Sequence, residues 1–189
     1  PRELFTLTIG DAAPRRRTTL NPWLSKVTLG QQEVVRYKAR DGLEIEGLLI
    51  HPIARKNKER VPLIVTVHGG PESHYRNGWI TSYGLLGQVA AGRGFAVFYP
   101  NYRGSTGRGV AYSKADHYDP GGKEFDDIVD GVDHLVNRGL VHSDKVGIMG
   151  GSYGGYAAAW GATYYSKKYA ASCVFVGVTD HISKIGTTD

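Results

Sequence analysis

The stretch Gly-Gly-Ser-Tyr-Gly-Gly at residues 150–155 constrains this chain more than any other part of its sequence. An apolar run at residues 146–149 comes directly before it, and an alanine-rich run follows it. This order predicts a strand, a very tight turn and a helix. Gly150, Ser152 and Gly154 match the nucleophile-elbow pattern G-x-S-x-G, in which the turn presents a serine hydroxyl to a base and an oxyanion hole. Glycine at the flanking positions avoids Cβ atoms that would clash in the turn.

The same glycine-rich turn has other interpretations. The plain structural one is a surface serine between a strand and a helix. A P-loop needs Lys and then Ser or Thr after its second glycine, but Tyr156 and Ala157 follow Gly155. A dinucleotide-binding turn needs glycines at n, n+2 and n+5, and no glycine within 147–155 satisfies that spacing. The sequence therefore disfavours nucleotide binding, and the strand and helix on either side favour a catalytic serine.

Length and composition are those of one soluble globular domain with a sizeable core. The chain has 189 residues, of which 41% are hydrophobic and 22% are charged. No run of about 20 apolar residues is present, so we expect no membrane span and no membrane partner. No secretory signal is visible. The sequence leaves the compartment open and slightly favours the cytoplasm.

The single cysteine and the charge distribution exclude further classes. One cysteine, Cys173, allows neither an internal disulfide nor a zinc site built on cysteines. Its apolar neighbours predict a buried thiol. The net charge is +5, and the only dense basic run is at residues 15–17. Because no aromatic residues are interleaved with these arginines, we predict a solvated loop and no nucleic-acid partner.

The pattern of apolar runs predicts an α/β protein. Residues 33–40 and 43–50 are expected to form a hairpin around Asp41-Gly42, a strong turn signal. Further strands are expected at 63–67, 95–99, 146–149 and 171–178, and helices at 80–91, 123–138 and 156–165. Two antiparallel strands followed by alternating strands and helices imply a mostly parallel sheet with helices on both faces. Ligands bind such sheets beyond the carboxyl ends of the strands, where Ser152 is expected.

A second glycine motif, His68-Gly69-Gly70-Pro71, follows the strand expected at 63–67. Acyl-transfer chemistry needs backbone N–H groups directed at the developing oxyanion. A glycine-rich turn here supplies one donor and the residue after the nucleophile supplies the other, so the pair would be Gly70 and Tyr153. A plain Gly-Gly-Pro turn is the alternative. Because His68 precedes the serine in the chain, we assign it to support of the loop rather than to the catalytic base.

Four stretches together resemble the prolyl oligopeptidase family of serine peptidases, especially its acylaminoacyl-peptidase and dipeptidyl-peptidase-like branch. They are residues 68–71, residues 101–107 (Asn-Tyr-Arg-Gly-Ser-Thr-Gly), the acidic segment around Asp126-Asp127, and residues 150–155. The resemblance runs from about Val34 to the end of the chain. It implies an α/β-hydrolase fold and hydrolysis of short peptides through an acyl-enzyme on Ser152. It also implies Gly70 and Tyr153 as the oxyanion donors.

The resemblance also implies a division of the chain. Residues 1–30 resemble the last strand and exit of the β-propeller that precedes the hydrolase domain in the family, and residues 31–189 resemble part of the catalytic domain. A triad in this fold needs Ser, then an acid, then His. Only His181 follows Ser152, and its neighbour Asp180 is expected to diverge from it. We therefore expect the acid and the histidine to lie beyond this chain.

Several expectations about partners follow from this division. We expect the sheet to be incomplete at its C-terminal side and the chain alone to be nearly inactive. The missing part of the domain, a propeller domain and a peptide substrate are the expected partners. An unpaired sheet edge also favours association with another copy of the chain.

We assign structural rather than catalytic roles to the charged residues near the predicted site. We expect Arg103 to pin the loop after the strand at 95–99 through backbone hydrogen bonds. Acidic residues gather in the helix at 123–138, where they complement the helix dipole and are expected to be solvated. They are Glu124, Asp126, Asp127, Asp130 and Asp133. We predict no metal and no cofactor.

The segment at residues 176–182 is, in the family, part of the pocket for the residue before the scissile bond. We place Tyr153, Val178 and Ile182 there, which implies an apolar or small substrate side chain. Core packing is an equal alternative for Val178. Two rival functions stay open: a carboxylesterase or lipase on the same fold, and a non-catalytic interaction domain derived from a hydrolase.

Overall fold

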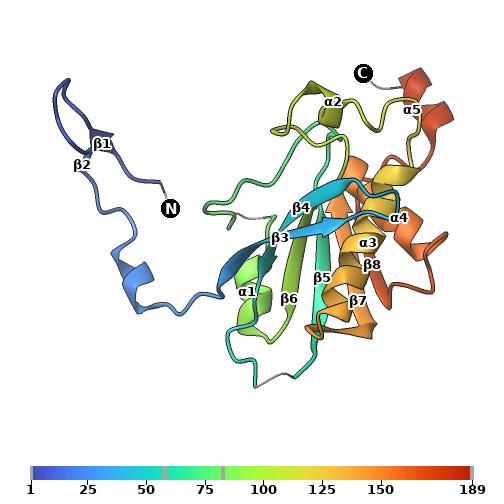
Figure 1. The fold of residues 1–189 in the computed structure, drawn as a ribbon, viewed down its shortest axis with the longest axis horizontal. Helices are drawn as coiled ribbons and strands as arrows, with labels where there is room; N and C mark the ends of the chain where they lie inside the picture. Colours follow the sequence, from blue (N-terminus) through green and yellow to red (C-terminus); the bar gives the residue numbers. More distant parts are fainter. Residues whose placement is uncertain (1, 57–58, 82–83, 188–189) are drawn as a thin grey trace.

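A six-stranded sheet forms the centre of the molecule (Figure 1). The structure is a computed structural model that describes residues 2–56, 59–81 and 84–187. The strands lie side by side in the order β3-β4-β6-β5-β7-β8. Their bounds are β3 (Gln32–Lys38), β4 (Glu44–Ile50), β5 (Val61–Val67), β6 (Ala96–Asn101), β7 (Val141–Gly151) and β8 (Ala171–Phe175).

The antiparallel part of the sheet comes first in the chain. β3 and β4 pair over their whole length, with Gln32 opposite Ile50 and Lys38 opposite Glu44. Gly42 turns the hairpin with a φ of 89°, a left-handed backbone that favours glycine. β4 pairs antiparallel with β6, whereas β5, β6, β7 and β8 are joined by parallel pairing. The expected hairpin and mostly parallel sheet are confirmed.

Helices cover both faces of this sheet. α1 (Gly87–Gly92) packs on one face, and α3 (Lys123–Asn137) and α4 (Tyr153–Ala162) pack on the other. Successive side chains of a strand point to opposite faces, so Phe98 joins the cluster beneath α3 and α4 while Tyr99 joins the cluster beneath α1. The shorter helices are η1 (Pro22–Lys26), α2 (Val110–Ser113) and α5 (His181–Thr187). Among the described residues, no helix is long and apolar enough to cross a membrane.

Two helix boundaries differ from the sequence-based expectation. A helix was expected over residues 80–91, but α1 begins only at Gly87; residues 82–83 of that range lie outside the described residues. Leu85 instead forms a β-bridge and, with Ile80, packs against the α1-side core. Glycine at 84 and 87 lowers helix propensity, which explains the late start. α4, in contrast, begins at Tyr153, earlier than expected, because the tight turn at Ser152 leads directly into the helix.

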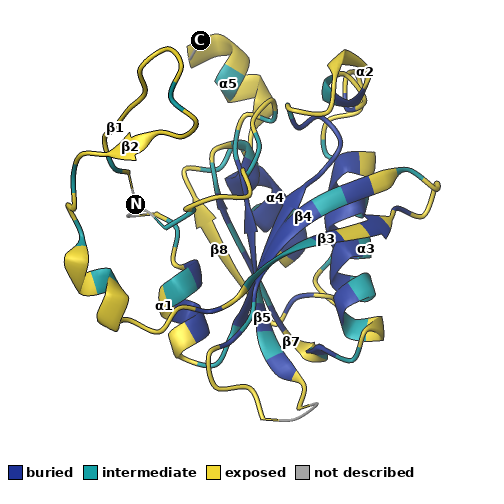
Figure 2. Ribbon diagram, turned by 60° about the vertical axis from the view of Figure 1, so that its left-hand side comes forward, coloured by how far each residue is buried: buried dark blue, intermediate teal, exposed yellow. Residues whose placement is uncertain are grey.

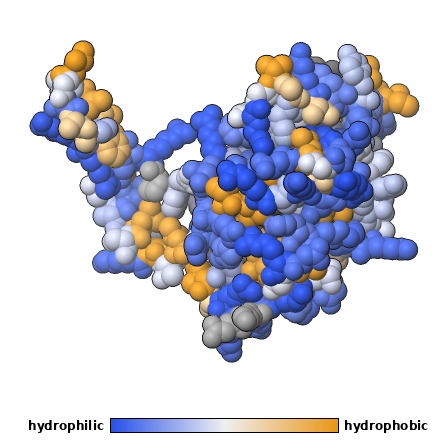
Figure 3. All heavy atoms as spheres, in the orientation of Figure 1, coloured by the Kyte–Doolittle hydropathy of each residue, from blue (hydrophilic) through white to orange (hydrophobic). Residues whose placement is uncertain are grey.

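Residues 2–30 form an arm that extends away from the sheet (Figure 1). Its first strand, β1, covers only Phe5–Thr6. It pairs with β2 (Arg15–Arg16), so two of the three arginines expected in a loop lie in a short strand. Every residue of these two strands is exposed, as Figure 2 shows in yellow. Apolar side chains at the end of the arm, including Leu7 and Ile9, are open to solvent (Figure 3).

At the β8 edge of the sheet, the prediction that Cys173 is buried is wrong. All five residues of β8 are exposed, and Cys173 lies exposed among them (Figure 2). An apolar sequence predicts burial only where another layer covers the strand. In the described part of the chain, β8 pairs with β7 alone. β8 therefore has the apolar composition of a buried strand, but it lies exposed at the edge of the sheet.

Candidate active site

Ser152 occupies the turn between β7 and α4 in an unusual backbone conformation. Its φ is 60° and its ψ is −122°, a region that residues with a Cβ rarely adopt. The turn is held by a hydrogen bond of 3.1 Å from the Ser152 N–H to the Phe175 carbonyl on the neighbouring strand. A Cβ at Gly150 would press on the Gly154 backbone, and one at Gly154 on the Val67 carbonyl. These contacts explain both glycines of the motif and leave the Ser152 side chain exposed.

The two expected oxyanion donors lie beside this serine. Tyr153 is the first residue of α4, and N–H groups in the first turn of a helix have no acceptor within the helix. Gly70 has a φ of 128°, and a Cβ on its neighbour Gly69 would lie 3.0 Å from the Ser152 Cβ. Gly70, Ser152 and Tyr153 line one cleft of about 790 Å³. The structure thus brings the two glycine motifs together at the carboxyl edge of the sheet.

The far wall of this cleft comes from the segment after β8 and from α5. Val178 lies there, whereas Ile182 does not line the cleft and is 88% exposed. His181 and Ile185 line it instead. Positions 181 and 185 are four residues apart, which is the spacing of one face of α5, whereas Val178 precedes that helix. That spacing was an available signal, and it was missed because no helix was expected after the strand at 171–178.

Asp180 and His181 have separate partners. The Asp180 carboxylate accepts hydrogen bonds from the N–H groups of Ile182 and Ser183 at the start of α5, at 2.9 and 3.2 Å. The His181 ring packs edge-on against Tyr156, with 5.1 Å between ring centroids. This arrangement is that of a helix cap and an aromatic contact.

The segment after β6 holds the loop that carries Gly70. The Asn101 side-chain amide binds both backbone groups of Tyr75, at 2.8 and 3.0 Å. The Thr106 N–H donates to the Ser73 carbonyl at 2.9 Å, and its hydroxyl bonds to His74 at 2.7 Å. These bonds anchor the downstream half of the glycine loop, so the Asn-Tyr-Arg-Gly-Ser-Thr motif is a clamp on the loop that carries Gly70.

His68 is fixed at the start of the same loop. Its imidazole stacks on Tyr102, with 4.4 Å between centroids, and the Tyr102 hydroxyl donates to the His68 carbonyl at 2.8 Å. The ring nitrogens contact the Gly69 carbonyl and the Ser105 hydroxyl, each at 2.9 Å. This pattern suits a neutral imidazole that donates from Nδ1 to Gly69 and accepts at Nε2 from Ser105. Burial lowers the pKa of His68 to about 4.

The lowered pKa of His68 predicts a specific pH dependence of stability. In the unfolded chain His68 takes up a proton near its ordinary pKa of about 6.5, whereas the folded protein resists protonation until about pH 4. Its contribution to stability is therefore complete above pH 6.5 and is lost as the pH falls toward 4. Between pH 7 and pH 4 we expect the free energy of unfolding to fall by about 3 kcal/mol more than in His68→Gln. Urea titrations of both proteins measure this, and parallel pH curves would contradict it.

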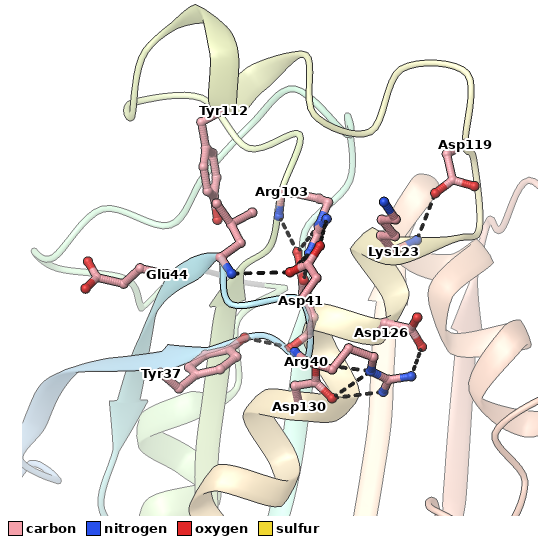
Figure 4. A network of polar contacts seen from close by, with 12 residues as sticks. Tyr37, Arg40, Asp41, Glu44, Arg103, Tyr112, Asp119, Lys123, Asp126 and Asp130 are labelled. Carbon is pink, nitrogen blue, oxygen red and sulfur yellow. Dashed lines mark hydrogen bonds and ion pairs between the residues drawn. The ribbon is translucent and has the colours of Figure 1, made fainter.

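Arg103 is buried between two carboxylates (Figure 4). Its guanidinium binds Asp127 at 2.9 and 2.7 Å and Asp41 at 2.7 and 3.0 Å, and its backbone N–H also donates to Asp127. The sequence-based role was loop support through backbone bonds, but the partners of the guanidinium are carboxylates. Hydrogen bonds from Arg103 lower the pKa of Asp41 to about 2. The arginine ties the end of β6 to the hairpin turn and to α3.

Two acids at the start of α3 correct the expectation that this acidic cluster is solvated. Glu124 and Asp127 are fully buried. Asp126 and Asp130, which are partly exposed, bind Arg40 at 2.7 and 2.8 Å (Figure 4). The difference arises because one side of α3 faces the core and the loop after β6, while the other faces solvent. In the described residues, no group of three or more His, Cys, Asp or Glu side chains could hold a metal.

A mostly parallel sheet with helices on both faces and a strained serine between strand and helix defines an α/β-hydrolase domain. The model of the prolyl oligopeptidase family matches residues 82–189 of this chain. The chain belongs to that family.

Known relatives of the chain are peptidases. The uncharacterized peptidase YuxL of Bacillus subtilis is 30% identical over 190 aligned positions, which cover 100% of this chain and 28% of that protein. Dipeptidyl aminopeptidase BIII of Pseudoxanthomonas mexicana is 43% identical over 117 positions, which cover 62% of this chain and 16% of that protein. The crystal structure of Pyrococcus horikoshii acylaminoacyl peptidase matches with a TM-score of 0.75 and 31% identity, over 94% of this chain and 27% of that one. The chain thus spans less than a third of each relative.

Proposed function

We propose that this chain is part of a serine peptidase that hydrolyses short peptides through an acyl-enzyme on Ser152. The observation that carries the proposal is the strained, exposed Ser152 in one cleft with Gly70 and Tyr153. The Ser152 Oγ attacks the peptide carbonyl carbon and transfers its proton to a base. The C–N bond then breaks, and the amine leaves with a proton. Water subsequently cleaves the ester and restores the serine.

The oxyanion of both tetrahedral intermediates would be bound by the N–H groups of Gly70 and Tyr153. Removing one such donor costs about 10²–10³ in rate in comparable hydrolases. The clamp on the Gly70 loop supports this role, because a fixed loop needs no rearrangement while charge develops. Val178, with His181 and Ile185 beside it, would contact the substrate side chain.

We further propose that the acid and the histidine of the triad are supplied by residues outside this sequence. Asp180 and His181 are occupied as a helix cap and an aromatic contact, and His68 is bonded to the glycine loop and Ser105. The greater length of the relatives supports the same proposal. In it, residues 1–30 lead in from a preceding propeller-like domain. Further chain of the same protein would pair with β8, and pairing with a second copy is the alternative.

Labelling with a fluorophosphonate tests the assignment of the nucleophile. In the full-length protein we expect one probe per molecule, located on Ser152 by peptide mass spectrometry, because only an activated serine reacts rapidly. Buried Ser105 serves as an internal control and should stay unmodified. A protein that takes up no label would favour the non-catalytic interaction domain.

The leaving group distinguishes a peptidase from a carboxylesterase or lipase on the same fold. Turnover of matched amide and ester substrates by the full-length protein is the measurement. Hydrolysis of both supports the peptidase. Hydrolysis of the ester alone would favour the esterase alternative, and the label on Ser152 would be the same in either case.

A further inference from the structure

Glu124 is a fully buried acid for which the proposed reaction gives no role. It is the second residue of α3. Its Oε1 accepts a hydrogen bond of 2.7 Å from the Tyr153 hydroxyl and another from the Gly121 N–H. Its Oε2 is buried without a hydrogen-bond partner among the described residues. Glu124 therefore connects the start of α3 to the residue directly after the nucleophile.

Complementing the helix dipole does not explain why this acid is buried. An exposed acid in the first turn serves the dipole equally well, and Asp126, two residues later, does so while partly exposed. Burying a carboxyl group with one unpartnered oxygen is costly. Burial also raises the pKa of Glu124, which favours the neutral acid. Its specific contacts are the hydrogen bonds from the Gly121 N–H and from the Tyr153 hydroxyl, and only the second joins Glu124 to another side chain.

Tyr153 stands between two clefts. One contains Ser152 and Gly70, and the other, of about 660 Å³, is lined by residues that include Asp116 and His117. The Tyr153 ring packs against Phe125, with 5.7 Å between centroids, and its hydroxyl donates to Glu124, with the Gly121 backbone as a second neighbour. The orientation of this ring therefore sets one wall of the Ser152 cleft, and the same residue carries a proposed oxyanion donor.

We infer that Glu124 is a positioning residue, which holds the Tyr153 hydroxyl and thereby fixes both the cleft wall and the first N–H of α4. Glu124 touches neither the substrate nor the reacting atoms. It acts through Tyr153, and the inference rests on the proposed peptidase function. An acceptor is what this role needs, so a neutral amide of the same shape should fill it and an apolar side chain should not.

A double-mutant cycle in the full-length protein tests this role. Tyr153→Phe removes only the phenolic hydroxyl, and Glu124→Leu removes the acceptor of both the Tyr153 hydroxyl and the Gly121 N–H. Each should lower kcat for an amide substrate by about tenfold, the scale of one lost hydrogen bond that acts through position. The double variant should show the same tenfold loss, because both changes break the same contact. Glu124→Gln should restore most of the turnover that Glu124→Leu loses.

Turnover is divided by the fraction of protein whose serine the fluorophosphonate can label. This separates an effect on positioning from an effect on folding. A merely structural role would lower the fraction of protein that takes the fluorophosphonate while leaving kcat per labelled site unchanged. That result, or additive losses in the double variant, would overturn the inference and leave the peptidase proposal intact. Wild-type protein that takes no label would overturn both. Equal losses in Glu124→Gln and Glu124→Leu would likewise contradict a role as hydrogen-bond acceptor.

Discussion

Replacing Ser152 with alanine should lower kcat of the full-length protein by a factor of about 10⁶ and abolish fluorophosphonate labelling. Without its Oγ no acyl-enzyme forms, and only the oxyanion donors and substrate binding remain to support hydrolysis. The backbone of the turn should be unchanged, because alanine keeps a Cβ in the same strained conformation. Steady-state hydrolysis of a chromogenic peptide amide, at matched protein concentration, is the measurement.

A second serine provides the control for this variant. Ser166 is exposed beyond the end of α4 and away from the cleft lining. Ser166→Ala should therefore keep wild-type turnover. If Ser152→Ala retained more than about a tenth of the activity, nucleophilic catalysis by this serine would be wrong, whatever the labelling showed.

Replacing Arg103 with methionine should lower the free energy of unfolding by about 3–5 kcal/mol. The change removes the guanidinium and leaves the Asp127 carboxyl group fully buried and without its ion-pair partner. Methionine retains much of the volume, so the loss reports on charge rather than on a cavity. Urea denaturation followed by intrinsic fluorescence measures the effect, and the glycine loop should open together with this part of the fold.

Arg40 offers the matched comparison. It also bridges two carboxylates of α3, Asp126 and Asp130 (Figure 4). Its side chain is 51% exposed, however, whereas that of Arg103 is 6% exposed. Solvent screens an exposed pair, so Arg40→Met should cost about 1 kcal/mol or less. Equal losses in the two variants would show that burial does not set the strength of these ion pairs.

The sequence predicted those features that depend on neighbouring residues. The motif at 150–154 identifies the strand, the turn and the helix together, although the steric reason for Gly154 is the Val67 carbonyl on another strand. The hairpin at Asp41-Gly42 is local. The convergence of the two glycine motifs also followed from the sequence, because parallel strands place their carboxyl ends at one edge.

Features that depend on distant packing were not predictable in this way. Cys173 was expected to be buried because composition gives the character of a strand but not whether another layer covers it. Glu124 was assigned to solvent because the pattern of an amphipathic helix does not show that Tyr153 lies above its first turn. Ile182 was placed in the cleft instead of Ile185 because no helix was expected after β8, whereas α5 puts positions 181 and 185 on one face.

At residue 152, stability and the proposed reaction favour different residues. The strained backbone favours glycine, whereas the reaction needs the serine hydroxyl. A positive φ with this ψ costs any residue with a Cβ about 1–3 kcal/mol, and glycine alone escapes the cost. A library of this protein sorted only for thermal resistance would therefore accumulate glycine at position 152 and lose its hydroxyl. Engineering of the scaffold has to measure turnover at every round, because the substitution that stabilises this turn also removes the proposed nucleophile.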